Sequence, residues 1–366
     1  MVGDSSRFAP GPSKSVCSEA PRVHLMGQPA GTYSGDISEG VPMSNPTLSR
    51  RTVLAGGAAV ALGATQLFTA GAAEAVKIGM PGRCALGAYV KADLDVNPGI
   101  SEPWSLEAVI DRTLRIGHNF QQWDTPYDGK VKDALARDIA AQRTPLLTWG
   151  AGPMSTVAAT NAGDNDLKIR TQAQNLKALG KLTFLRFTWE MDLDTRGYYV
   201  DKPTYRSAMR RVYGLFQDEG ATNVRFVFCP TWQAYKDGAA DALSYYPGDD
   251  YVDWVGADGY ARPWNSYATL PTMFGAFHDF GELHGKPMMI AETGVHHATG
   301  AVATPADWIN RMASDLKNSL PGIRACLYFD TTGTDADKNN WRIEGHAQSG
   351  VAFKSVAADP YMQVEF

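Results

Sequence analysis

The sequence predicts a (β/α)8 barrel, and three observations favour this fold class. Short apolar runs typical of buried strands alternate eight times with segments of helical periodicity. The part that carries the alternation, from Val76 to Phe366, has about 290 residues, a length typical of one such barrel. Acidic and aromatic residues gather at the carboxyl ends of the strand patterns, where these barrels bind their ligands. A doubly wound open sheet is the alternative.

The strand patterns are short runs rich in Val, Ile, Leu and aromatic residues, bounded by Gly, Pro or polar loop residues. Continuous apolar runs of this length are expected of parallel strands that are covered on both faces. In chain order they are Ala85–Val90, Asn119–Asp124, Pro145–Trp149, Thr183–Glu190, Val224–Pro230, Trp254–Tyr260, Pro287–Glu292 and Arg324–Asp330.

The helical patterns fall between and after the strands, and most have recognisable ends. Leu106–Ile116 begins after Ser105 and stops at Gly117, and Asp166–Leu179 stops at Gly180. The fifth helical pattern is short and poorly defined. The complete set is Leu106–Ile116, Val131–Gln142, Asp166–Leu179, Thr204–Asp218, Asp237–Tyr246, Leu270–Leu283, Ala306–Leu320 and Val351–Ala358.

The N-terminal part carries an export pattern. Ser49–Leu54 places a twin arginine before the uncharged run Val53–Ala73, which ends in a small-x-small cleavage pattern at Ala75. The pattern resembles a bacterial twin-arginine signal, and its Gly-rich run argues against a permanent membrane span. We therefore expect residues 1–75 to form a disordered extension and a signal peptide cleaved near Ala75. Residues 76–366 are expected to form a single secreted, extracellular catalytic domain.

Composition and cysteine usage narrow the class of protein further. A net charge of −5 and 44% hydrophobic residues are typical of a soluble globular protein. Because the sequence contains no basic run, we expect no nucleic-acid partner, and for the mature form we expect a monomer without membrane contact. Cys84, Cys229 and Cys326 have no metal-ligand spacing and are expected to be buried thiols.

Two glutamates end two of the predicted strands and carry the functional hypothesis. Alternation along the strands puts Glu190 on the same face as Arg186, and Glu292 on the same face as Ile290 and Met288. In one barrel both carboxylates would point into the same mouth. Paired carboxylates at close range are what hydrolysis of a glycosidic bond needs.

Four segments resemble glycoside hydrolase family 26, a family whose founding activity is β-mannanase. The resemblance covers roughly Lys181 to Gly294, in register and with the correct spacing, and is most specific in the sixth-strand segment. The segments are Leu185–Asp192, Ala221–Trp232, Tyr245–Tyr260 and Lys286–Gly294.

The resemblance implies a role for several residues. Glu190 would be the general acid/base and Glu292 the nucleophile, with Tyr260 donating a hydrogen bond to Glu292. Arg186 and Asp258 would support these carboxylates, although pairing of Arg186 for stability alone is an equal alternative. Side chains that the resemblance suggests for stacking on sugar rings are Trp232, Trp264 and, at the end of the eighth strand, Tyr328 or Phe329.

The chain departs from the family pattern beside the acid/base. The family usually carries His directly before this Glu, where the imidazole contacts bound sugar, but this chain has Trp189. An indole N–H donates one hydrogen bond and accepts none. The Asn-Gly that often follows is replaced by Asp192 and Leu193. Both departures predict altered sugar specificity with the same chemistry.

Further candidates come from the loops alone. Asp124, which follows Trp123, can bind a sugar hydroxyl or cap a loop. Trp149 can form a flat surface on which a sugar ring stacks, or it can pack against other side chains at the edge of the barrel. Trp341, in a long loop, is a stacking candidate. The loop's Asp335–Asn339 only partly matches a calcium loop, so we expect no metal and no cofactor. The pair His296 and His297 is expected to line the cleft or face solvent.

Three hypotheses from different classes follow. The first is a retaining endo-β-glycanase on a polysaccharide, with β-1,4-mannan first and mixed-linkage β-glucan, β-1,3-xylan or a bacterial exopolysaccharide next. The second is a metal-dependent barrel lyase or hydrolase, and the third a sugar-binding barrel without activity. The ligands of the second would be Asp124, Glu190, Asp258, Glu292 and Asp330.

Overall fold

A computed structural model describes residues 82–93, 99–150, 152, 154–193, 201–298, 305–333 and 340–366. The chain divides into the units Met1–Gly63 and Ala64–Phe366, and every described residue belongs to the second. The export pattern, its cleavage position and the partial calcium loop Asp335–Asn339 lie outside the described residues.

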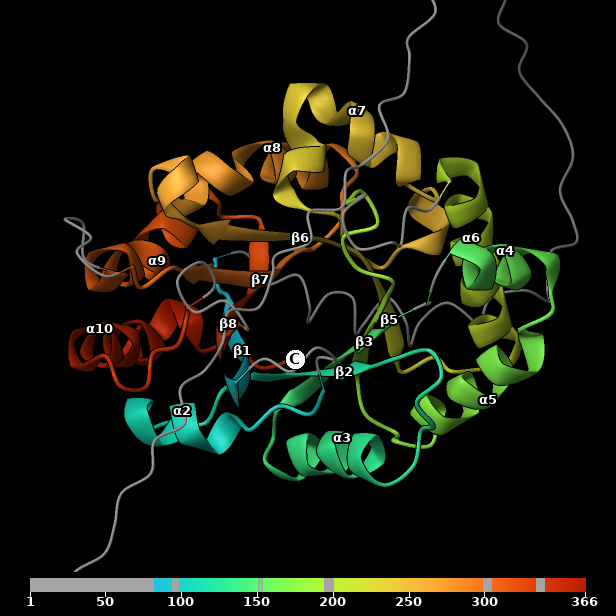
Figure 1. Ribbon diagram of the computed structural model, residues 1–366, viewed down its shortest axis with the longest axis horizontal. Helices are drawn as coiled ribbons and strands as arrows, with labels where there is room; N and C mark the ends of the chain where they lie inside the picture. The colour runs from blue at the N-terminus through green and yellow to red at the C-terminus, as the bar shows by residue number, and fades with distance from the viewer. Residues whose placement is uncertain are drawn as a thin grey trace, which may run out of the picture. The chain divides into compact units, whose positions relative to one another are not determined.

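Eight parallel strands form a closed barrel in sequence order, with β8 returning to pair with β1, and helices surround them (Figure 1). The predicted (β/α)8 barrel is therefore confirmed, and the open doubly wound sheet is wrong. The strands are β1 (Ala85–Asp93), β2 (Ile116–Gln121), β3 (Thr144–Trp149), β4 (Thr183–Phe187), β5 (Val224–Phe228), β6 (Trp254–Ala261), β7 (Met288–Val295) and β8 (Ile323–Thr332).

The α-helices follow the predicted patterns, with one addition. Because α4 has only two buried residues, Val157 and Thr160, it lacks the apolar periodicity from which the other helices are predicted. The helices are α2 (Pro103–Ile110), α3 (Lys130–Ala140), α4 (Met154–Ala162), α5 (Asp166–Lys177), α6 (Lys202–Asp218), α7 (Lys236–Tyr245), α8 (Leu270–Leu283), α9 (Pro305–Ser319) and α10 (Ala347–Ala358). No helix of the described residues is long and apolar enough to cross a membrane.

The first helix and the second strand differ from the prediction. Asp111 has left-handed backbone angles and ends α2, so the predicted continuation to Ile116 is wrong. Leu114 and Ile116 continue the helical spacing of apolar residues by coincidence, but both are buried beyond the helix. As a result β2 begins at Ile116, three residues before the predicted strand. The poorly patterned α7 is likewise irregular, with non-helical angles at 237–239.

Two apolar clusters fill the fold. The smaller one takes a residue from every strand and is therefore the interior of the barrel. The larger one lies between the strands and the helices and includes Met288 and Ile290. The smaller cluster contains Ala85, Ile116, Leu146, Phe184, Val227, Cys229, Trp254, Met289, Ala291, Ala325 and Leu327.

The three cysteines of the described residues, Cys84, Cys229 and Cys326, are free and buried, which confirms the prediction for their thiols. Cys229 lies inside the barrel, whereas Cys84 and Cys326 belong to the outer cluster. Burial raises the pKa of Cys326 to about 12, so its thiol stays protonated and unreactive at neutral pH.

Gly87 in β1 offers a test of how closely the barrel interior is packed. An added Cβ would lie 2.7 Å from Ile116 Cβ and 2.8 Å from Leu327 Cγ. We expect Gly87→Ala to destabilise the protein by about 1–3 kcal/mol, because neither neighbour has room to move. Urea unfolding followed by fluorescence would measure this.

Gly214→Ala is the matched control, since an added Cβ in α6 meets nothing within 4 Å. In a helix this change should stabilise by about 0.5–1 kcal/mol. Equal unfolding midpoints for the two variants would contradict the packing argument.

Candidate active site

A pocket of about 270 Å³ opens at the carboxyl ends of the strands. Its walls come from the ends of β2, β6, β7 and β8 and from the segments that follow β4, β5 and β6. The lining residues are Phe120, Trp189, Glu190, Leu193, Thr231, Trp232, Gln233, Asp258, Gly259, Tyr260, Arg262, Trp264, Glu292, Phe329 and Trp341.

Glu190 reaches this pocket through an irregular backbone. The strand β4 ends at Phe187, and Thr188 and Glu190 have φ angles of 54° and 48°. The prediction of a strand as far as Glu190 is therefore wrong. Because the alternation is lost, Trp189 and Glu190 both line the pocket. Left-handed angles at non-glycine residues cost roughly 1–3 kcal/mol each and concentrate at functional sites.

Glu292 reaches the pocket through a break in strand register. Ile290 pairs with Ala257, but Glu292 pairs with Asp258, so β7 has one extra residue at this point. Below this bulge, Met289 and Ala291 point into the barrel. The predicted inward set of Met288 and Ile290 is therefore wrong, although Glu292 does face inward. A bulge turns a side chain to the other face of the sheet, which is what aims Glu292.

A buried guanidinium holds the carboxylates in place. Arg186 Nη1 donates to both carboxylate oxygens of Asp258, at 2.8 and 2.7 Å. Arg186 Nη2 donates to Glu292 Oε1, and Arg186 Nε donates to Thr148 Oγ1 at 2.8 Å. The Arg186 side chain is fully buried. Its orientation, and with it that of Glu292, is set by these contacts.

Tyr260 supplies the other contact to Glu292. Its hydroxyl donates to Glu292 Oε2 at 2.6 Å, so each oxygen of this carboxylate accepts one hydrogen bond. Burial, and then the neighbouring charge of Glu292, raise the pKa of the Tyr260 hydroxyl well above its ordinary value. Tyr260 therefore remains a hydrogen-bond donor.

The pocket holds more carboxylates than cations. Burial raises the pKa of Asp258 well above its ordinary value; Arg186 opposes this, and the charges of Glu292 and Glu190 add to it. Burial and then Arg186 lower the pKa of His118, which lies beside Arg186 and stays neutral. Arg186 pairs with two carboxylates, Asp258 and Glu292, and the charge of Glu190 also acts on Asp258. These groups are therefore electrostatically coupled.

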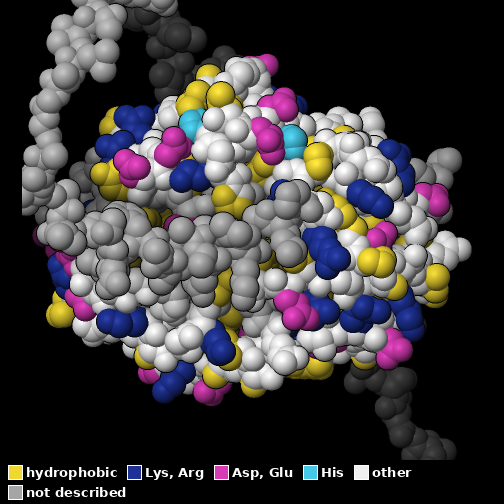
Figure 2. Space-filling model, turned by 180° about the vertical axis from the view of Figure 1, so that it is seen from behind, with side chains coloured by type: hydrophobic (Ala, Val, Ile, Leu, Met, Phe, Trp, Pro, Cys, Tyr) yellow, Lys and Arg dark blue, Asp and Glu magenta, His cyan; other side chains and the backbone are white. Residues whose placement is uncertain are grey.

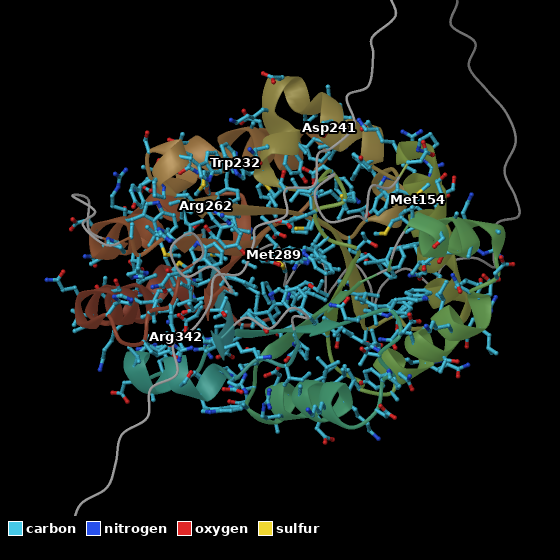
Figure 3. All side chains as sticks on the ribbon, in the orientation of Figure 1. Met154, Trp232, Asp241, Arg262, Met289 and Arg342 are labelled. Carbon is cyan, nitrogen blue, oxygen red and sulfur yellow. The ribbon has the colours of Figure 1, made fainter. Side chains whose placement is uncertain are left out.

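Aromatic side chains form much of the pocket wall. Lys236 Nζ lies 4.2 Å from the centroid of the Trp232 ring. Trp341 packs on Tyr260 with ring centroids 4.6 Å apart, and the Arg262 guanidinium lies 4.9 Å from the centroid of Trp341. Figure 3 shows Trp232 and Arg262 among the side chains around β6. Such rings stack on the apolar faces of sugars.

Several residues suggested by the sequence lie elsewhere. Trp149 is 1% exposed and stacks on Trp123 with centroids 4.7 Å apart, so it presents no face to a ligand. Trp123 and Asp124 border a second hollow, and Asp124 is 3.0 Å from Lys168 Nζ. Tyr328, the alternative to Phe329, is fully buried in the outer cluster.

The carboxylates proposed as metal ligands do not assemble. Asp124 borders the second hollow, and Asp330 is fully buried and accepts a hydrogen bond from the Ile343 backbone at 2.6 Å. Within the described part of the chain, no three His, Cys, Asp or Glu side chains are grouped so that they could hold a metal ion.

The pocket also contains residues that the sequence did not single out. Phe120 was placed at the start of the predicted second strand, but that strand lies three residues earlier and Phe120 is near its carboxyl end. Gln233 lies in the short 3-10 helix Trp232–Tyr235 after β5, and Arg262 directly follows β6. A correct strand boundary would have identified Phe120, whereas nothing in the sequence marks the other two.

The comparisons with known proteins agree with this site. The model of "Glycosyl hydrolase family 26" matches residues 191–344. Endoglucanase H of Acetivibrio thermocellus is 26% identical over 284 residues, covering 73% of this chain and 30% of that protein. A beta-1,3-xylanase of Alcaligenes sp is 27% identical over 154 residues, covering 41% and 31%. The chain spans about a third of the length of these relatives.

Solved structures share the fold at lower identity. A family 26 β-mannanase from Bacteroides ovatus superposes with a TM-score of 0.60 at 15% identity, covering 80% of this chain and 93% of that one. An endo-β-1,4-mannanase double mutant from Cellulomonas fimi reaches 0.58 at 15% identity, covering 78% and 73%. The resemblance inferred from the sequence is confirmed. The chain is similar to glycoside hydrolases of family 26 in sequence and in fold.

The family match begins at Met191, directly after Glu190, and includes Tyr260 and Glu292. The matched region thus supplies Glu292 and its hydroxyl donor, whereas Arg186 and the wall residue Phe120 precede it.

The two histidines after β7 form a structural contact outside the pocket lining. His297 Nε2 lies 2.9 Å from Ser349 Oγ, and its ring stacks on His346 with centroids 4.1 Å apart. Burial, followed by the charge of His346, lowers the pKa of His297 to about 4. His296 is buried, with its backbone amide donating to Ala261. The predicted exposure of the pair to solvent is wrong.

Tyr260→Phe should lower kcat/KM by about 10- to 100-fold, because a hydrogen bond to a charged carboxylate contributes roughly 1.5–3 kcal/mol. Tyr235→Phe is the control: the Tyr235 hydroxyl donates to Gly256 O at 2.8 Å, away from the pocket lining. Steady-state kinetics on folded protein would compare the two. Equal losses would argue against a specific role for Tyr260.

The lowered pKa of His297 predicts that the free energy of unfolding depends on pH. Its pKa is about 4 in the folded protein and about 6.5 when unfolded, so its stabilising effect is complete above pH 6.5 and is lost as the pH falls toward 4. The loss should be up to about 1 kcal/mol per pH unit. His297→Gln does not titrate in this range and should show a smaller decrease in urea midpoint between pH 7 and pH 5. Parallel decreases in both proteins would contradict this.

Proposed function

We propose that this protein hydrolyses internal β-glycosidic bonds of a polysaccharide with retention of anomeric configuration. The observation that carries the proposal is the joint placement of Glu190 and Glu292 in one aromatic-lined pocket, with Glu292 held by Tyr260 and Arg186. Retaining glycosidases use two carboxyl groups in this way, one as nucleophile and one as acid and then base.

The environments of the two glutamates assign their roles. Glu292 accepts one hydrogen bond on each oxygen, from a guanidinium and from a hydroxyl, and both contacts favour the ionised form. Glu292 is therefore proposed as the nucleophile, and Glu190, the second glutamate of the pocket, as the general acid and then the base.

Hydrolysis then proceeds in two displacements. A Glu292 oxygen forms a bond to the anomeric carbon while the bond from that carbon to the leaving oxygen breaks, and Glu190 protonates the leaving oxygen. Forming the ester removes the charge of Glu292, which makes Glu190 a better acid and, once deprotonated, the base for the next step. Glu190 then takes a proton from water, the water oxygen bonds to the anomeric carbon, and Glu292 is released.

For the substrate we favour a β-glucan. The relatives found by sequence, at 26% and 27% identity, are named as an endoglucanase and a β-1,3-xylanase. The mannanases share the fold at 15% identity, which carries no inference about the sugar. Trp189 supports a site that differs from that of the mannanases. β-1,4-Mannan, expected first from the resemblance, and β-1,3-xylan remain candidates.

The protein is also proposed to be exported, on the strength of the twin-arginine pattern Ser49–Leu54. Replacing both arginines by lysine in a bacterial host with this pathway should retain the protein in the cytoplasm, as measured by cell fractionation. Export of that variant at the original level would contradict the proposal.

The deciding experiment is chemical rescue of the two glutamate variants. Glu190→Ala and Glu292→Ala should each lose at least about 1000-fold in kcat on an aryl β-glycoside while remaining folded. Azide should restore turnover of both, giving a β-glycosyl azide with Glu190→Ala and an α-glycosyl azide with Glu292→Ala, since each retains the other carboxylate.

Glu282→Gln is the matched control, because this glutamate is 63% exposed on α8. Its activity should equal that of the unaltered protein. Inverted assignment of the two azide products would exchange the proposed roles. Activity that survives in Glu292→Ala without azide, or that disappears with EDTA, would reject the mechanism in favour of a metal-dependent one.

A further inference from the structure

A second hollow adjoins the catalytic pocket and shares one wall residue with it, Phe120. Its volume is about 780 Å³, within the range of small-molecule sites. The described residues around it come from the ends of β1 and β2 and from the segments that follow β1, β2 and β3, and they include neither Trp264 nor Arg262. Phe120 itself packs on Trp189 and Tyr89, with ring centroids 5.5 and 5.1 Å away. It therefore forms a fixed boundary between the two hollows.

Exposed tryptophan is found in both hollows. All nine tryptophans of the chain lie within the described residues, and two of them are exposed: Trp104, by 52%, and Trp264, by 64%. Trp264 lines the catalytic pocket and Trp104 lines the second hollow. Single exposed apolar side chains are common on protein surfaces, but each of these two rings also lines a hollow that Phe120 borders, where it can stack on a ligand.

Trp104 is held in position. The Arg137 guanidinium lies 5.0 Å from the centroid of its ring. Arg137 Nη2 in turn donates to the backbone oxygen of Ser101 at 2.9 Å. Trp104 also lies in the first turn of α2, directly after Pro103. A ring fixed in this way loses little conformational entropy when a ligand stacks on it.

Trp123 borders the same hollow but is not equivalent. It is 6% exposed, stacks on Trp149 at 4.7 Å, and has Lys168 Nζ 4.7 Å from its ring centroid. Both contacts cover the ring, so Trp104 is the residue of this hollow that can offer a broad aromatic face.

The charges of the hollow favour an uncharged, hydroxyl-rich ligand. Lys91 and Lys130 are matched by Glu102 and Asp124, so the formal charges of the described lining residues sum to zero. Amide and hydroxyl groups of the same lining can exchange hydrogen bonds with sugar hydroxyls. Figure 2 likewise shows basic and acidic side chains interspersed over the described residues of the face it presents.

We propose that the second hollow binds further units of the same uncharged polysaccharide that is cleaved beside Phe120, with Trp104 as the stacking platform. The inference rests on the proposed function and adds to it the direction and length of the bound chain. A glycan that runs from Trp264 past Glu190 and Glu292 to Trp104 contacts the protein on both sides of the scissile bond. Cleavage within chains follows from this arrangement.

The test compares long and short substrates. Trp104→Ala should lower the ratio of kcat/KM on a long oligosaccharide to kcat/KM on an aryl disaccharide by about tenfold, the effect of one lost aromatic contact. Trp104→Phe should restore most of the ratio. Leu283→Ala, which removes an 81% exposed side chain outside both hollows, is the control and should leave the ratio unaltered.

A second measurement separates this inference from the proposed function. Calorimetry with a graded series of gluco- and manno-oligosaccharides in a Glu292→Ala background should show affinity that rises with chain length, and the rise should vanish when Trp104→Ala is added. Equal losses on short and long ligands, or no loss at all, would overturn the role of Trp104. Absence of hydrolysis by the unaltered protein, with length-dependent binding intact, would count against the proposed function alone.

Discussion

The site depends on the buried guanidinium of Arg186. Asp258 and Glu292 both approach it inside the barrel, where an isolated carboxylate would be costly to keep ionised. Removing one member of such a buried set costs about 3–5 kcal/mol, because the remaining charges lose their partner. Arg186 thereby links the stability of the upper barrel to the position of the Glu292 carboxylate. The two roles considered for Arg186, support of the carboxylates and ion pairing for stability, therefore rest on the same contacts.

Backbone irregularity aims the two glutamates. The bulge in β7 turns Glu292 inward, and the left-handed residues Thr188 and Glu190 place Trp189 and Glu190 together in the pocket. In regular strands, Glu292 would follow Met288 and Ile290 toward the helices. Strand pairing is irregular beside Glu292, and the backbone angles are strained at Thr188 and Glu190, which are the two places where the carboxylates enter the pocket. Strain and bulges next to active sites follow this logic generally.

The residues around Glu292 and those of the second hollow occupy different parts of the chain. The region matched by the family model, residues 191–344, contains Tyr260, Glu292 and the wall residues Trp232 and Trp264. The second hollow is built from residues between Lys91 and Gly152, which lie before that region.

The sequence by itself determined the barrel, most element positions and both glutamates, because apolar periodicity and strand-end acids are local patterns. The tertiary structure decided which residues far apart in the sequence contact one another, because local patterns carry no information on such contacts. The convergence of Arg186, Asp258 and Glu292 joins residues more than 100 positions apart. The inward turn of Glu292 depends on register against β6, and the burial of Trp149 depends on its stacking with Trp123. Trp104 and Phe120 became candidates only when the fold brought their hollow beside the carboxylates.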